Sequence, residues 1–135
     1  MRPPDLLVSE TREWRKRARA DAQAAELLAG AGLYSESVYH CQQCAEKALK
    51  AILTWNQQPF PKTHDLGDLR VLCEQVSPLW KDKLQGVERL TQYAWRFRYP
   101  GAPWEPTDAD AATAIAAVKG VLSVVEDYLR PVLDE

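Results

Sequence analysis

The amino-acid sequence predicts an all-α fold, an up-and-down bundle of four long helices plus one shorter helix, in a single domain spanning residues 1–135. Apolar residues recur at three- and four-residue intervals along most of the chain, whereas no segment alternates convincingly at period two. Proline, glycine and helix-capping residues divide the chain into segments separated by short loops. The sequence therefore favours packed helices and argues against a sheet.

The first long helix is expected to begin at Ser9 and Glu10, after an extended lead-in over residues 1–8, and to be stopped by Gly30 and Gly32. Its buried stripe is Trp14, Ala18, Ala25 and Leu28. Its opposite face carries Arg12, Arg15, Lys16 and Arg19. Such a basic stripe can hold phosphates, but this pattern is more typical of a solvated helix face.

The second helix is expected over residues 34–55, antiparallel to the first because the loop over 31–33 is very short. Its apolar face is Val38, Cys41, Ala45, Ala48, Leu49 and Ile52. A polar cluster shares the other side of this helix: His40, Gln43, Glu46, Lys47 and Lys50. Spacing alone favours a solvated face on which Glu46 pairs with Lys50, an interaction worth a few tenths of a kcal/mol.

Three further helices complete the predicted bundle. The shorter one is expected to begin at Thr63 or Asp65, and Ser77-Pro78 to separate it from a fourth long helix that ends near Arg98. Thr107 starts the last helix, which Pro131 ends. A heptad-like seam runs along this helix through Ile115, Val118, Leu122, Val125 and Leu129.

Bulk properties narrow the class of protein. The net charge of −2 does not indicate a nucleic-acid or membrane partner by itself. No apolar run reaches membrane-spanning length and residues 10–20 are strongly polar, so we expect a cytoplasmic protein without a membrane partner. We expect Cys41, Cys44 and Cys73 to be small core residues, and we expect no metal and no cofactor, because the two histidines are poorly spaced for zinc.

Three motifs occur in order along the chain. The first, H-x-x-Q-x-x-E-K-x-x-K, runs from His40 to Lys50; the second, P-K-T-H-D-L, covers 61–66; the third, R-Y-P-G, covers 98–101. Each motif alone is weak evidence, since lone histidines are mostly structural. Together they resemble the HEPN family, and the positions of Trp14 and Asp21 are similar to that family as well.

This resemblance implies a helical bundle that usually dimerises, is often encoded beside a small nucleotidyltransferase, and is associated with nucleotide or RNA. Many HEPN proteins are metal-independent ribonucleases that act as toxins or in host defence. Those enzymes carry an arginine followed four to six residues later by a histidine. The present sequence departs from that motif, because no histidine follows Arg96 or Arg98 and His64 is the last histidine of the chain.

The first hypothesis is accordingly a binding module of a toxin–antitoxin or defence type system, with a nucleotide or RNA as ligand, a small nucleotidyltransferase as partner, and a homodimer as its assembly. The lysines and arginines of the motifs would hold phosphate, and aromatic side chains would stack on a base. The expected ligand-binding residues are His40, Gln43, Glu46, Lys47, Lys50, Lys62, His64, Arg96, Arg98 and Tyr99.

Two alternatives remain open. In one, Glu46 and Lys50 form a buried polar network that fixes helix register in a purely structural, dimeric interaction protein. In the other, the chain is a metal-independent ribonuclease with a displaced centre, in which His64 is the general acid/base and Arg98 stabilises the developing charge. From the sequence we rank the binding module first, the structural protein second and the ribonuclease third.

Overall fold

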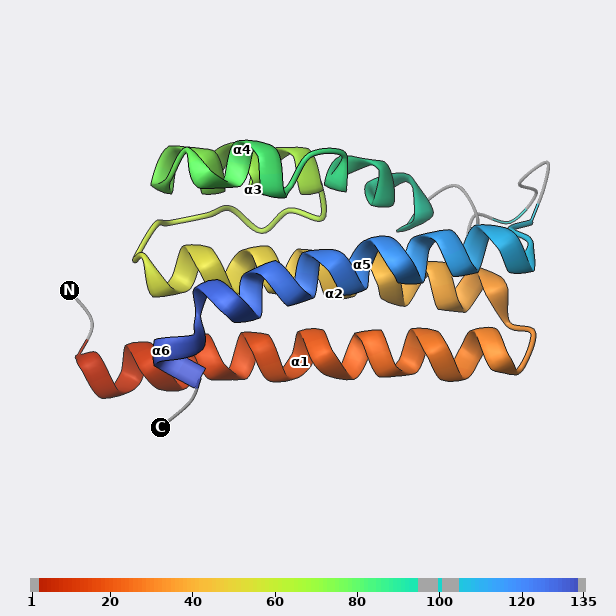
Figure 1. Ribbon diagram of the computed structural model, residues 1–135, viewed down its shortest axis with the longest axis horizontal. Helices are drawn as coiled ribbons and strands as arrows, with labels where there is room; N and C mark the ends of the chain where they lie inside the picture. The colour runs from red at the N-terminus through yellow and green to blue at the C-terminus, as the bar shows by residue number, and fades with distance from the viewer. Residues whose placement is uncertain (1–2, 95–99, 101–104, 134–135) are drawn as a thin grey trace.

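The structure, a computed structural model, describes residues 3–94, 100 and 105–133, and those residues form helices and connecting loops without a strand (Figure 1). The helices in chain order are α1 (Pro4–Gly30), α2 (Tyr34–Trp55), α3 (Leu66–Val76), α4 (Leu79–Lys83), the 3-10 helix η1 (Val87–Ala94), α5 (Asp108–Tyr128) and α6 (Arg130–Leu133). The predicted all-α bundle is confirmed. Among the described residues, no helix is both long and apolar enough to cross a bilayer.

Helix α2 is the centre of the bundle. In Figure 1, α1 runs along one side of α2, α3 and α4 cover the opposite side, and α5 crosses beside both long helices. Cys41, Ala45, Leu49 and Ile52 of α2 are completely buried, as the apolar pattern predicts. Because neighbours surround α2, polar side chains on this helix also lie against protein and need partners there.

The capping residues fix two of the helix starts where the sequence predicts them. The side chain of Asp65 accepts a hydrogen bond from the backbone N–H of Asp68 at 3.2 Å, which caps α3. Thr107 and Asp110 form a capping box at α5: the Asp110 N–H donates to Thr107 Oγ1 at 3.2 Å, and the Thr107 N–H donates to Asp110 Oδ2 at 2.8 Å. Each cap satisfies backbone donors that the first helical turn leaves free.

Both chain ends differ from the prediction. Helix α1 begins at Pro4, so residues 4–8 belong to the helix and Ser9 lies inside it. Proline is compatible with the first helical turn, where its missing N–H would have no intrahelical partner. At the other end α5 stops at Tyr128, and Pro131 lies within the short helix α6 instead of ending the last helix.

The fourth long helix is replaced by two short elements, α4 and η1. Gly86 has a φ of 82°, a left-handed conformation that interrupts a helix and that glycine adopts most easily. The apolar pattern is nevertheless correct, because Trp80, Leu84, Val87 and Leu90 are all buried. The side chain of Arg70 in α3 holds η1 in place, with Nη1 2.9 and 3.0 Å from the two carboxylate oxygens of Glu88.

Candidate functional site

Glu46 is the centre of a polar network on α2, and only 4% of this residue is exposed. Lys50 Nζ donates to Glu46 Oε2 at 3.1 Å, and His64 Nδ1 lies 2.9 Å from Glu46 Oε1. Gln42 Nε2 donates to the same Oε1 at 3.4 Å. We call Gln42, Glu46, Lys50 and His64 the Glu46 cluster.

Lys50 lies close to two aromatic rings as well as to its carboxylate partner. Its Nζ lies 5.5 Å from the ring centroid of Trp14 in α1 and 5.7 Å from that of Phe60 in the loop after α2. A cation at this range is attracted by the ring quadrupole. Only 8% of Lys50 is exposed. The expectation of a solvated Glu46–Lys50 pair is therefore wrong, because α1 and the loop cover this part of α2.

A second network of the same design joins α1 to α2. Asp21 of α1 is 8% exposed, and its Oδ1 lies 2.8 Å from His40 Nδ1. Its Oδ2 accepts a hydrogen bond from Lys47 Nζ at 2.5 Å. We call Asp21, His40 and Lys47 the Asp21 cluster. In both clusters a buried carboxylate lies between one lysine and one histidine, so neither lysine is an uncompensated charge.

The histidines of the two clusters differ in access to solvent. Each directs Nδ1 toward a carboxylate oxygen, an acceptor that favours the tautomer with the hydrogen on Nδ1 and leaves Nε2 for another partner. The side chain of His64 is 67% exposed, whereas that of His40 is 32% exposed. His64 is thus the histidine that a ligand reaches most easily, and a buried carboxylate fixes its ring.

Gln42 is a member of the cluster that the sequence motif did not identify. It is fully buried, its Nε2 donates to the backbone carbonyl of His64 at 2.9 Å, and its Oε1 accepts from Gln43 Nε2 at 2.7 Å. Gln42 therefore attaches the segment before α3 to α2. Its position one helical turn before Glu46 is the signal in the sequence, since residues four apart are neighbours on a helix.

The remaining predicted site residues are distributed as follows. Lys62 is exposed, two residues before His64. The backbone N–H of Leu66 donates to Thr91 Oγ1 at 2.9 Å, so η1 lies beside the start of α3. Arg96, Arg98 and Tyr99 lie outside the described residues. The structure thus brings His64 to Glu46 and Lys50, joins His40 to Lys47 through Asp21, and connects Gln43 to the Glu46 cluster through Gln42.

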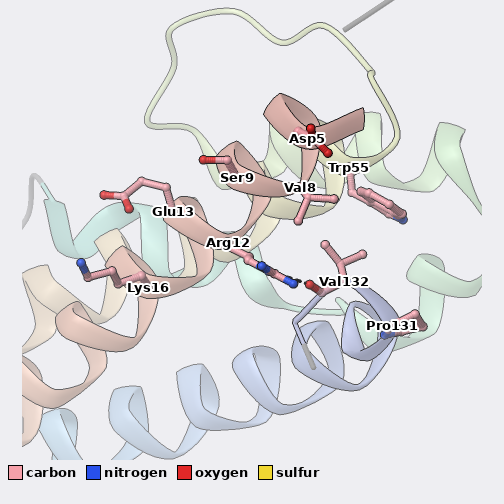
Figure 2. A pocket seen from close by; sticks show the side chains of 9 residues that line it. All are labelled: Asp5, Val8, Ser9, Arg12, Glu13, Lys16, Trp55, Pro131 and Val132. Carbon is pink, nitrogen blue, oxygen red and sulfur yellow. Dashed lines mark hydrogen bonds between the residues drawn. The ribbon is translucent and has the colours of Figure 1, made fainter. Parts of the chain in front are cut away.

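A larger hollow lies away from both clusters. It has a volume of about 720 Å³ and lies between the start of α1 and α6 (Figure 2). Arg12 Nε crosses it to donate to the carbonyl oxygen of Val132 at 2.8 Å. Its charged lining residues are Asp5, Arg12, Glu13 and Lys16. These charges balance, and no residue of the three motifs lines the hollow, so it is not the candidate site.

The cysteines are buried free thiols, as expected for core residues. Burial raises the pKa of Cys41 and of Cys73 from 9.0 to about 12, and it also raises the pKa of Cys44, because the charged thiolate is poorly solvated inside the core. Among the described residues, no three histidine, cysteine or acidic side chains form a group that could hold a metal.

These thiols predict a loss of stability at high pH. Above pH 9 the thiols of the unfolded chain lose their protons while the folded thiols keep theirs up to about pH 12. The free energy of unfolding should therefore fall as pH rises, by about 1.4 kcal/mol per pH unit for each such thiol. Urea unfolding from pH 8 to 11 measures this slope. A variant with Cys41→Ala and Cys73→Ala should have a shallower slope, and an unchanged slope would contradict the assignment.

Comparisons with known proteins identify the family of this chain. The model of the HEPN domain matches residues 11–128. A protein of Methanocaldococcus jannaschii named "Putative toxin MJ1304" is 36% identical over 129 residues, which cover 85% of this chain and 85% of that protein. No solved structure matches the chain. The matched region includes both polar clusters, and the chain belongs to the HEPN domain family.

Proposed function

We propose that this HEPN protein is a binding module of a toxin-like system, which recognises a nucleotide or RNA and acts together with a small nucleotidyltransferase. The observation that carries this proposal is the exposed His64, whose ring is fixed by the buried carboxylate of Glu46. The toxin-like part is supported by the name of the M. jannaschii relative. We expect the module to be a homodimer in the cytoplasm.

Contacts in the two polar clusters suggest which residues position the histidines and which contact the ligand. Lys47 and Lys50 are paired with carboxylates, so we assign them to positioning the histidines. Lys62 and His64 are exposed and can contact a phosphate or a base edge directly. Lysine neutralises phosphate charge, and a neutral histidine nitrogen accepts a hydrogen bond. Arg96, Arg98 and Tyr99 remain predicted ligand-binding residues that follow η1 in the chain.

A titration of the protein with ATP, GTP and a short single-stranded RNA at low salt tests this proposal, with tryptophan fluorescence as the signal. We expect saturable binding that weakens with salt. A variant with Lys62→Ala and His64→Ala should bind about tenfold or more weakly, since it removes two charged or polar groups that reach the ligand. The matched control is Lys81→Ala with Gln75→Ala, two exposed residues that lie outside the clusters. Equal weakening in both variants, or no binding at all, would contradict the proposal.

A ribonuclease is the second candidate function, and the same geometry favours it. With Nδ1 directed at Glu46, His64 Nε2 could take the proton of an RNA 2′-OH. That oxygen would then attack the adjacent phosphorus to form a 2′,3′-cyclic phosphate. The bond from phosphorus to the 5′ oxygen would break, and the leaving oxygen would take a proton from water. Gel analysis of RNA after incubation tests this function. Cleavage by the parent that is abolished in His64→Ala would support it, and equal cleavage by both would rule it out.

A further inference from the structure

A second charged groove lies between α1, α5 and α6, and no member of the Glu46 cluster lines it. It has a volume of about 430 Å³. Four basic side chains line it: Arg15, Arg19, Lys119 and Arg130. Its acidic lining residues are Glu126 and Asp127, and its apolar ones include Leu122 and Leu133. Lys119 also pairs with Glu26, so four positive and three negative charges leave a local excess of one positive charge, in a chain whose net charge is −2.

Two arginines of this groove share one carboxylate. Glu126 Oε2 lies 2.6 Å from Arg15 Nε and 3.5 Å from Arg19 Nε. Each arginine uses Nε for this interaction, and the terminal amino groups of both make no hydrogen bond to another described residue. One carboxylate cannot neutralise two guanidinium groups. The arrangement therefore leaves guanidinium donors and one positive charge facing the groove.

We propose that this groove binds a phosphate group of a nucleotide or of an RNA strand, as a site separate from the Glu46 cluster. The planar guanidinium fork matches the oxygens of phosphate and can donate two parallel hydrogen bonds to it. The basic side chains come from α1, α5 and α6. Because the folded bundle already holds them together, no segment has to fold when the ligand binds. Lys119, paired with Glu26, and Arg130, paired with Asp127, form the edge of the groove.

The sequence alone favoured a solvated face for Arg15 and Arg19, because their partners are distant in the chain. Glu126 is 111 residues from Arg15 and becomes its neighbour only when α5 packs on α1. The side chains of Arg19 and Arg130 are 57% and 66% exposed. They can be changed without opening the core, which makes the groove testable in a folded protein.

The test measures binding of pyrophosphate, ATP and a fluorescein-labelled single-stranded RNA to the full chain. Arg19→Gln combined with Arg130→Gln should weaken binding at least about fivefold, and should reduce the slope of log affinity against log salt for RNA by about 0.7 for each phosphate that the variant no longer neutralises. Glu126→Gln should strengthen binding about threefold or more, because it removes the carboxylate that competes with phosphate. The matched control, Arg17→Gln with Lys81→Gln, removes the same charge from other surfaces.

The outcomes separate this site from the proposed function. If pyrophosphate and ATP bind as RNA does, the ligand is a nucleotide phosphate, and if only RNA binds, it is the strand backbone. Arg19→Gln with Arg130→Gln should weaken binding by the same factor in the Lys62→Ala and His64→Ala background as in the parent, because the groove and the Glu46 cluster are separate sites. The proposal is overturned if the groove variant and its control bind with equal affinity, or if Glu126→Gln has no effect. A preference for poly-glutamate over phosphates would also overturn it.

Discussion

Replacing Glu46 with alanine is expected to lower the free energy of unfolding by about 3–5 kcal/mol, because it leaves the ammonium of Lys50 buried without its carboxylate. Lys50 is 8% exposed, and its Nζ lies 5.5 and 5.7 Å from the ring centroids of Trp14 and Phe60, so the surrounding protein shields most of this side chain from water. The substitution also removes the partner of His64 and Gln42. Chemical denaturation followed by circular dichroism measures this change.

The paired variant Glu46→Leu with Lys50→Met is the control for charge burial. It removes both ions together, and buried ion pairs can be replaced by apolar residues of similar volume with little change in stability. We expect its free energy of unfolding to lie within about 1–2 kcal/mol of the parent. If the single and paired variants are destabilised equally, the ion pair is not the reason for the cost.

Replacing Trp80 with alanine should cost about 3–5 kcal/mol of unfolding free energy, as expected for removal of a large buried ring. Trp80 is fully buried in α4 and packs edge-on against Tyr128 of α5, with ring centroids 4.9 Å apart. It therefore joins the short helix α4 to α5. Thermal or urea unfolding gives the magnitude, with a change below about 1 kcal/mol contradicting this role.

Trp80→Phe distinguishes packing from hydrogen bonding at the same position. The indole Nε1 of Trp80 makes no hydrogen bond to another described residue, so phenylalanine reduces the ring volume and breaks no polar interaction. We expect a cost clearly smaller than that of alanine, about 1–2 kcal/mol. A cost equal to that of alanine would indicate that the indole nitrogen has an important partner.

Local signals in the sequence were sufficient for much of the fold. The loop over 31–33 and the regular apolar spacing predict α2 correctly, and the Thr107 capping box marks the start of α5. The division of the fourth helix was not predicted, because Gly86 is tolerated in a helical pattern and its left-handed conformation depends on how α4 and η1 pack. The buried pattern of Trp80 and Leu84 survives this division.

The burial of Glu46 and Lys50 was one of the two arrangements that the sequence left open, and the structure shows the buried one. The spacing of Glu46 and Lys50 is the same on a solvated face and in a buried network, and only tertiary packing distinguishes the two. Trp14 and Phe60, whose rings lie beside Lys50 Nζ, come from α1 and from the loop after α2. Likewise, Gln42 is identifiable as a cluster member only through its hydrogen bond to the His64 carbonyl, which forms when the segment before α3 folds onto α2.

The most direct test of the Glu46 cluster as a ligand site is an NMR titration of the histidine ring signals with short single-stranded RNA and with ATP. The chain has two histidines, so the ring spectrum is simple, and His64→Gln assigns it. We predict that the His64 signal shifts in a saturable manner while the His40 signal changes little, because His64 is exposed and His40 is half-buried against Asp21. Saturable binding that leaves the His64 signal unmoved would contradict ligand recognition at this cluster.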